Sequence, residues 1–276
     1  MNKDVLKLQS KIEIPDNFMN VQLRKNATDY RFHYHEYFEI EFILSGKGKT
    51  IVNGNEIELK KGVVYMLRPT DMHEFFVDEK ITNYNVSFTY AMMDNELMQE
   101  FMSYNNYVYC RLSESETEEL LFLMRFLEKE YKGKNKSSDK VKRWIFNVIV
   151  SYVLKKRVVN SDLKLDANDN CIIEGLKYLH ANFFKDPSLN ETADITGLQK
   201  NYFCRKFKET TGKTYVEYLN DLKIDYAKQL LQSTEKSITE LCFICGYHSM
   251  SQFITEFKKR TGFSPKLYRK NKSMPN

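Results

Sequence analysis

The sequence predicts a multidomain α+β protein, in which an N-terminal β-barrel with a helical pair precedes an all-α domain with two helix-turn-helix units. The first hundred residues alternate short β-branched and aromatic runs with turn residues, which favours strands. Farther along the chain, apolar residues recur at helical spacing. Near the C-terminus one pattern occurs twice, with a period of about 50 residues, which indicates an internal duplication.

Three runs define the predicted strands: EYFEIEFILSG, GKTIVNGNEIELKKG and VVYMLRPTDMHEFFV. They are separated by Gly46, the Asn53-Gly54 pair and Gly62. An Asn-Gly pair between apolar runs is a strong hairpin signal. Short strands at this spacing are typical of a sandwich or a barrel.

Two amphipathic helices are predicted next, over residues 116–131 and 141–157. Their apolar positions are Leu120, Leu123, Met124, Leu127 and Tyr131, then Val141, Trp144, Ile145, Val148 and Tyr152. Such a pair can cover its own sheet or form the seam of a dimer. The sequence leaves both interpretations open.

The polar stretch VNSDLKLDANDN marks the predicted linker. We therefore expect a domain over residues 1–158, a linker over 159–169 and a helical domain over 170–276.

The duplicated pattern is ITGLQKNYFCRKFKETTGKTYVEYL and, later, ICGYHSMSQFITEFKKRTGFSPKLYRK. Gly197 matches Gly246 at an offset of 49, and Phe203 matches Phe253 at an offset of 50. Each copy divides into a short helix, a glycine turn and a second helix. That order is the helix-turn-helix pattern.

Charge and composition narrow the class of protein. Residues 168–276 hold 17 Lys and Arg against 12 Asp and Glu, which accounts for the whole net charge of +5. Residues 258–272 include seven basic residues and no acidic one.

No apolar run of membrane-spanning length and no secretory signal is visible, and the five cysteines are scattered. We expect a cytoplasmic protein with reduced thiols.

The second helix of each unit presents one buried and one outward face. Phe203, Phe207, Phe253 and Phe257 are expected in the core. Candidate DNA contacts face the other way: Asn201, Cys204, Arg205 and Lys208 in the first unit, and Ser251, Gln252, Thr255 and Lys259 in the second. Arg, Asn, Gln, Ser and Thr can pair with base edges, whereas Lys suits phosphates. A rigid helix between the units could place both in successive major-groove turns, roughly 34 Å apart.

The C-terminal hundred residues resemble the AraC/XylS-type transcription regulators. SITELCFICGYHSMSQFITEFKKRTGFSPKLYRK is similar to that family's signature, and EYLNDLKIDYAKQLL to its linker helix. The resemblance implies DNA binding, RNA polymerase as a partner and activation or repression of transcription. Gln199 stands where the family usually has an N-cap Ser, and Gln caps a helix poorly.

The N-terminal half carries H-x-H-x3-E, with His33, His35 and Glu39, and a later His73. Residues 18–90 resemble the cupin-like sensing domain that often precedes AraC-type helices. We expect Arg31, His33, His35, Glu39 and His73 to bind a small-molecule effector, with a sugar or related metabolite suggested by the resemblance. A structural role, or a metal site of the kind found in cupins, are the alternatives.

The preferred hypothesis is a homodimeric, effector-controlled DNA-binding regulator, with no enzymatic activity and no cofactor. Two alternatives stay open. One is a metal-dependent cupin enzyme fused to a DNA-binding domain. The other is a DNA-binding regulator controlled by a protein partner.

Overall fold

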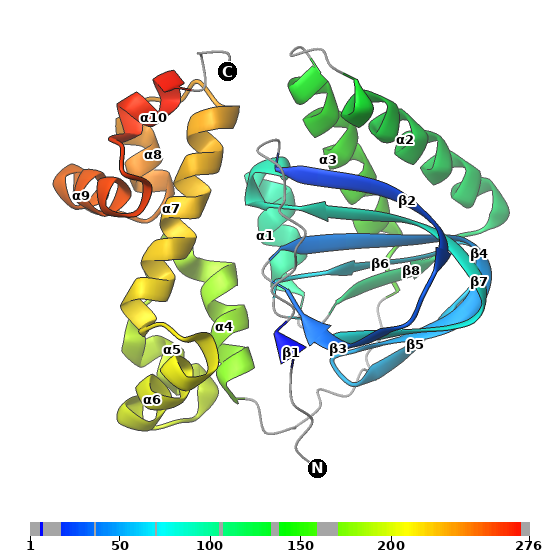
Figure 1. Ribbon diagram of the computed structural model, residues 1–276, viewed down its shortest axis with the longest axis horizontal. Coiled ribbons are helices and arrows are strands. Elements are labelled where there is room, and N and C mark those ends of the chain that lie inside the picture. Colours follow the sequence, from blue (N-terminus) through cyan, green and yellow to red (C-terminus); the bar gives the residue numbers. More distant parts are fainter. Residues whose placement is uncertain are drawn as a thin grey trace. The chain divides into compact units, whose positions relative to one another are not determined.

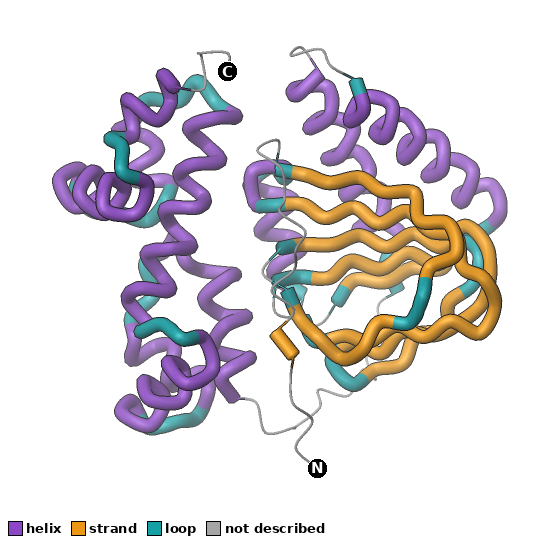
Figure 2. The backbone as a smooth tube through the Cα atoms, viewed as in Figure 1, coloured by secondary structure: helices purple, strands orange, loops and turns teal. Residues whose placement is uncertain are grey.

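The computed structural model describes residues 6–7, 18–35, 37–69, 71–104, 107–133, 138–158 and 171–271. It divides into two compact units, Met1–Ala167 and Asn168–Asn276. The predicted linker over 159–169 lies outside the described residues, so the domain boundaries stay a prediction. Figures 1 and 2 show a sheet with helices in the first unit and helices throughout the second.

The first unit confirms the change from strands to helices. Its elements are β1 (Leu6–Lys7), β2 (Met19–Ala27), β3 (Tyr30–Tyr34), β4 (Phe38–Val52), β5 (Asn55–Leu59), β6 (Val63–Leu67), β7 (His73–Phe88), a 3-10 turn (Tyr90–Met92), α1 (Asn95–Ser103), β8 (Val108–Arg111), α2 (Glu114–Lys132) and α3 (Ser138–Lys156). Asn53 and Gly54 form the β4–β5 turn with positive φ angles of 49° and 81°, as the hairpin signal predicts.

All eight strands belong to one sheet, with the order β1-β3-β7-β4-β6-β8; β2 also pairs with β7 and β5 with β4. The long strands β4 and β7 pair along most of their length, and their register shifts between Ile43 and Gly48. Within the described residues no pairing joins β8 to β1, so the sheet is not closed into the expected barrel. The α+β architecture, a sheet-rich unit followed by a helix-turn-helix unit, is confirmed.

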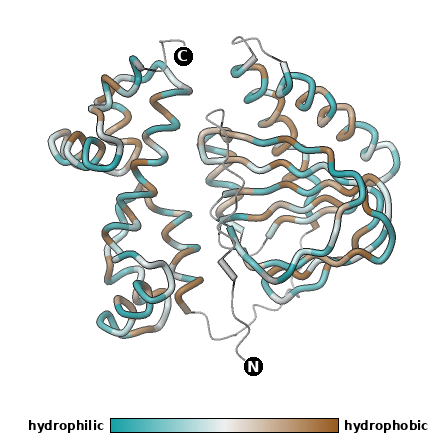
Figure 3. The backbone as a smooth tube through the Cα atoms, in the orientation of Figure 1, coloured by the Kyte–Doolittle hydropathy of each residue, from teal (hydrophilic) through white to brown (hydrophobic). Residues whose placement is uncertain are grey.

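The helices cover one apolar face of the sheet, and a separate buried apolar cluster that includes Ile43, Val63 and Tyr65 lies on the other side. Alternate residues of β4 and β7, such as Phe38, Ile40 and Val86, are buried in one core with Leu120 of α2 and Phe146 of α3. Because side chains alternate along a strand, the residues between them lie on the opposite face. Figure 3 shows this alternation of hydrophobic and hydrophilic residues along the strands.

Helices α2 and α3 lie side by side against the sheet (Figure 1). Leu120, Met124 and Leu127 of α2 are buried, as predicted. On α3 the predicted stripe is only partly correct, because Ile145 is buried whereas Trp144 is 66% exposed and Val148 is 52% exposed. The pair therefore covers its own sheet and still presents apolar side chains to solvent.

The second unit is helical throughout its described residues. Its elements are α4 (Cys171–Asn182), a 3-10 turn (Phe183–Lys185), α5 (Leu189–Thr196), α6 (Lys200–Thr211), α7 (Tyr215–Ser233), α8 (Ile238–Ile244), α9 (Met250–Thr261) and α10 (Pro265–Asn271). The pairs α5–α6 and α8–α9 are the two predicted helix-turn-helix units, and α7 joins them.

The duplicated helices pack as predicted. Phe203 and Phe207 of α6, and Phe253 and Phe257 of α9, are fully buried. The N-caps differ between the copies. Ser249 accepts a hydrogen bond from the Gln252 backbone N–H, whereas the structure gives Gln199 no side-chain cap. This is the difference expected from replacing Ser by Gln.

The two turn glycines have the same backbone conformation and different surroundings. Gly197 has a φ of 67° and Gly246 a φ of 76°. A Cβ on Gly246 would lie 2.7 Å from the Phe184 carbonyl oxygen, whereas no described atom lies within 4 Å of that position on Gly197. The second turn therefore packs against backbone, and the first does not. No described helix has the length and apolar character needed to cross a membrane.

Candidate functional site

The sheet face opposite the helices carries a row of buried polar side chains. Glu39 and Glu41 of β4 lie two residues apart and so share this face, as do Asn83 and Asn85 of β7. Glu41 is paired with Asn85 in the strand register, which brings the two sets together.

Asn85 bridges the two carboxylates. Its Nδ2 donates to Glu39 Oε1 at 2.5 Å and to Glu41 Oε1 at 2.7 Å. Asn83 Nδ2 also donates to Glu41, and Arg24 lies 3.3 Å from Glu41 Oε1. Among the described residues no hydrogen-bond partner is found for the buried Asn83 Oδ1. Among the described residues, this face of the sheet therefore offers one buried acceptor without a hydrogen-bond partner, Asn83 Oδ1. It lies beside the carboxylates of Glu39 and Glu41, which are hydrogen-bonded.

Burial and the adjacent Glu39 carboxylate raise the pKa of Glu41 to about 8, against the opposing charge of Arg24. Burial and the neighbouring carboxylate therefore favour the protonated form of Glu41. A neutral Glu41 relieves the repulsion that two buried carboxylates at this distance would otherwise have.

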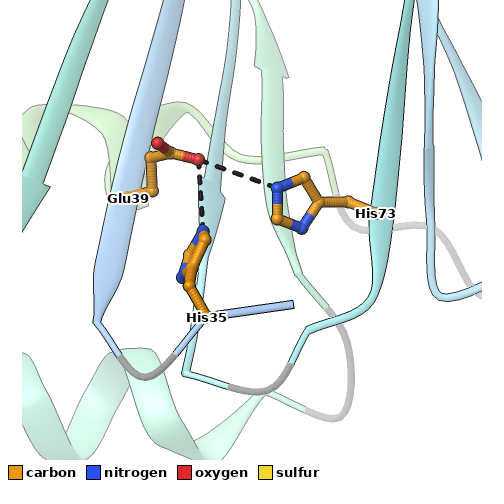
Figure 4. Close-up of side chains that lie close together, drawn as sticks. All are labelled: His35, Glu39 and His73. Atoms are coloured by element: carbon orange, nitrogen blue, oxygen red, sulfur yellow. Dashed lines mark hydrogen bonds and ion pairs between the residues drawn. The ribbon is translucent and has the colours of Figure 1, made fainter. Parts of the chain in front are cut away.

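Three histidines meet at one end of this row. His33 of β3 is paired with His73 of β7 in the strand register, and their ring centroids are 4.1 Å apart. The His35 ring lies 5.0 Å from the His73 ring and stacks on Tyr37. Figure 4 shows His35 and His73 pointing toward the same carboxylate oxygen of Glu39.

Each histidine Nδ1 lies at hydrogen-bond distance from a backbone carbonyl. The distances are 2.6 Å from His33 to the Arg31 oxygen, 2.8 Å from His35 to the Tyr37 oxygen and 3.0 Å from His73 to the Asp71 oxygen. A carbonyl oxygen can only accept, so Nδ1 carries the proton in each ring. In the neutral form each Nε2 then has a free lone pair.

Glu39 Oε2 faces two of these Nε2 atoms, at 3.4 Å for His35 and 3.9 Å for His73. Burial and the two neighbouring histidines lower the pKa of His73 to about 3, so its ring is neutral at physiological pH. Burial alone would raise the pKa of Glu39, but the hydrogen bond and charge of His35 and the charge of His73 lower it. One ligand atom from each of His35, Glu39 and His73 lies within 4.8 Å of the other two, so the three residues could hold a metal ion.

The structure thus brings together four of the five predicted effector residues: His33, His35, Glu39 and His73. The Arg31 side chain is exposed, and its backbone oxygen instead accepts from His33. Sequence reasoning missed Arg24, Glu41, Asn83 and Asn85. Their spacing of two within strands was a usable signal, because it places Glu41 beside Glu39 on one face.

In the helical unit, the predicted DNA contacts lie on the outer faces of α6 and α9. Seven are exposed, and Cys204 is half-buried: Asn201, Cys204, Arg205, Lys208, Ser251, Gln252, Thr255 and Lys259. The Arg205 side chain is 66% exposed, its guanidinium lies 5.1 Å from the Tyr202 ring centroid, and its Nε is 3.9 Å from Glu209. These weak contacts leave the guanidinium able to reach a ligand.

Cys242 and Cys245 are buried in the helical core, and burial raises the pKa of both thiols. Protonated, buried thiols are poor metal ligands, so these residues fit a packing role.

Comparison with known proteins matches both units. A family model for an AraC-like ligand binding domain matches residues 21–120, and one for a helix-turn-helix domain matches residues 192–271. The transcriptional activator RhaS of Escherichia fergusonii is 24% identical over 246 residues, which cover 87% of each chain. RhaS of Escherichia coli K12 is 24% identical over 258 residues, covering 91% of this chain and 92% of its own. The C-terminal domain of AraT, a response regulator from Geobacillus stearothermophilus, is 28% identical, covers 38% of this chain and 88% of that domain, and has a TM-score of 0.36.

A ligand-binding domain followed by a helix-turn-helix domain defines an effector-controlled DNA-binding regulator. The chain belongs to the AraC family of transcription regulators.

Proposed function

We propose that this regulator docks α6 and α9 into successive major-groove turns of one DNA site. The observation that carries the proposal is the duplicated outward face of these helices, which are joined by the single helix α7. Asn201, Arg205, Gln252 and Thr255 are proposed to read base edges, and Lys208 and Lys259 to contact phosphates. Ser251 and the half-buried Cys204 complete the proposed contact surface.

The polar face of the sheet is proposed to bind the effector, a sugar or related polyhydroxy metabolite. Asn83 Oδ1 supports this chemistry, because a buried acceptor without a partner favours a ligand hydroxyl that donates to it. Arg24 and the histidines lie on or beside the same face. The effector controls DNA binding only if it prefers one arrangement of the protein over another. The proposed role of this face is sensing and not catalysis.

The regulator is proposed to act in the cytoplasm as a homodimer and to contact RNA polymerase. Exposed apolar pairs on α2 and α3 support dimerisation through these helices. Phe122 is 69% exposed and Phe126 39%, while Trp144 and Val148 form a similar pair on α3. Large apolar side chains grouped on adjacent helices are typical of protein interfaces.

Fluorescence anisotropy with a DNA site selected from a random library tests DNA binding. We expect the full chain to bind the selected site at least tenfold more tightly than scrambled DNA. Equal binding to both would contradict sequence-specific regulation. For the effector, thermal unfolding against a panel of sugars is expected to show a raised midpoint with one of them. An Asn83→Ala variant should lose that shift, and the exposed-site variant Lys47→Ala should keep it.

A further inference from the structure

We propose that Tyr202 is a positioning residue for DNA recognition, whose ring holds the Arg205 guanidinium over the N-terminal turns of α6, ready to pair with a guanine. The inference rests on the proposed function, because it assumes that α6 lies in the major groove. It adds the residue that orients one base-reading side chain and the base that this side chain selects.

Tyr202 is a large aromatic side chain on the outward face of α6. It is 42% exposed, whereas Phe203 and Phe207 of the same helix are fully buried. Tyr202 lies three residues before Arg205, and side chains at this spacing are neighbours on a helix surface. Arg205 Cζ lies 5.1 Å from the centre of the Tyr202 ring, within the range of about 6 Å for a cation–π contact.

This contact also gives the Arg205 side chain a direction. Long side chains on a helix lean back toward its N-terminus, so Arg205 lies over the turn that carries Tyr202. In helix-turn-helix proteins the N-terminal residues of the recognition helix contact base edges. The ring therefore keeps the guanidinium beside the part of α6 that is expected to meet the bases.

Glu209 competes for Arg205 from the next turn of α6, but its contact is weak. Its Oε1 is 3.9 Å from Arg205 Nε, which is longer than a hydrogen bond, and its Oε2 is 3.1 Å from Lys206 Nζ. Stacking on a ring uses the flat face of a guanidinium and leaves the N–H groups at its edge free. Those N–H groups are the ones that pair bidentately with guanine O6 and N7.

The second helix-turn-helix unit lacks this arrangement. At the offset of 50 residues, Gln252, Thr255 and Lys259 replace Tyr202, Arg205 and Glu209. We therefore expect the guanine contact only in the half of the DNA site that α6 binds. An arginine that is already oriented loses less conformational freedom on binding, so the ring should strengthen that contact.

The test measures how strongly the full chain prefers guanine in the selected DNA site. The relevant base position is the one whose preference disappears in Arg205→Ala. Fluorescence anisotropy then compares guanine with adenine at that position. We expect Tyr202→Leu to reduce the preference for guanine about two- to fivefold, the range of an exposed cation–π contact, and Tyr202→Phe to keep it. Phe243→Leu, which removes another exposed aromatic ring, should match the wild type.

A double-mutant cycle separates positioning from direct contact of Tyr202 with DNA. Tyr202→Leu should weaken binding to the selected site in the wild-type background and have no further effect when Arg205 is already alanine. A loss of the same size in both backgrounds would mean that Tyr202 contacts DNA itself, and this result would overturn the proposal.

Nuclear magnetic resonance of the free chain tests the contact without DNA. Protons over the face of an aromatic ring are shielded, so the Arg205 Nε–H proton should resonate upfield in the wild type and in Tyr202→Phe. Tyr202→Leu should remove this shift, and Arg205→Lys assigns the signal by its absence. An unshifted signal in the wild type would overturn the proposal.

The two readouts distinguish this inference from the proposed function. A ring-shifted Arg205 signal together with equal binding to selected and scrambled DNA would contradict the proposed function and leave the orientation of Arg205 in place. A guanine preference that Arg205→Ala loses and Tyr202→Leu keeps would contradict only the role of Tyr202.

Discussion

Lys223 Nζ lies 2.5 Å from Asp186 Oδ1 and 2.8 Å from the Gly246 carbonyl oxygen. This buried ammonium on α7 therefore joins the segment before α5 to the turn of the second helix-turn-helix unit. A Lys charge is rarely buried unless it is paired, so both contacts are needed. Within the helical domain, these contacts help to fix the second helix-turn-helix motif relative to the first.

Replacing Lys223 by Met should remove this connection. We expect a loss of about 2 kcal/mol in the free energy of unfolding of the helical unit, because two hydrogen bonds to a charged group disappear. Urea unfolding followed by circular dichroism measures the loss. Lys228→Met is the matched control, since Lys228 pairs with Asp225 within the same helix. Equal losses in both variants would show that the Lys223 contacts add nothing specific.

The two turn glycines provide a second matched pair. Gly197→Ala should lower the free energy of unfolding by about 1 kcal/mol. The only strain in this variant comes from holding alanine in the left-handed backbone conformation. Gly246→Ala should cost clearly more, because its new Cβ would also meet the Phe184 carbonyl oxygen at 2.7 Å. Thermal unfolding of the two variants gives the comparison. A Gly246→Ala variant as stable as Gly197→Ala would mean that the close approach relaxes without cost.

Asp221 should make the helical unit sensitive to acid. Burial alone would raise its pKa, but hydrogen bonds from Lys213 and Arg260 lower it below the ordinary value of 3.8. Its contribution to stability is therefore fully present above pH 3.8 and is lost as the pH falls through the lower folded-state pKa.

The free energy of unfolding of the wild type should exceed that of Asp221→Asn by about 1 kcal/mol at neutral pH. Urea titrations over a pH series should show this difference shrinking only in strong acid. Asp225→Asn, on the same helix, provides the control. A difference that is constant down to the lowest pH would exclude the Asp221 ion pairs as its source.

DNA binding should weaken steeply with salt, because phosphate contacts release counterions.

Arg205→Ala should reduce the free energy of binding to the selected site by about 1–3 kcal/mol and leave binding to scrambled DNA almost unaffected. Lys208→Ala should weaken both equally and lower the salt slope by about one. Anisotropy titrations at several salt concentrations measure all three. An equal loss on both DNAs for Arg205→Ala would reassign Arg205 to phosphate contact.

Trp144→Ser should weaken the proposed dimer without unfolding the chain, since this side chain is 66% exposed. Sedimentation equilibrium should show a larger fraction of monomer than for the wild type. Phe243→Ser is the control, because Phe243 is also exposed, at 58%, and lies on α8. A wild type that is monomeric at all concentrations would contradict dimerisation.

Local patterns in the sequence were sufficient for much of the fold. The Asn53-Gly54 hairpin, the buried Phe203 and Phe253, and the weak cap at Gln199 each depend on neighbouring residues and on backbone propensity. The duplication was equally visible, because both copies keep their phenylalanine spacing and their glycine turn. These local features are sufficient to predict the family without knowledge of any contact between distant residues.

The tertiary structure decided what distant segments do together. The pairing of His33 with His73, and of Glu41 with Asn85, depends on strand register across the sheet. Packing also places the carbonyl groups that orient the histidines. It likewise makes the surroundings of Gly246 crowded and leaves those of Gly197 open. Sequence alone supplied the donor residues, because side-chain chemistry is local. Their geometry required long-range pairing, which no short pattern encodes.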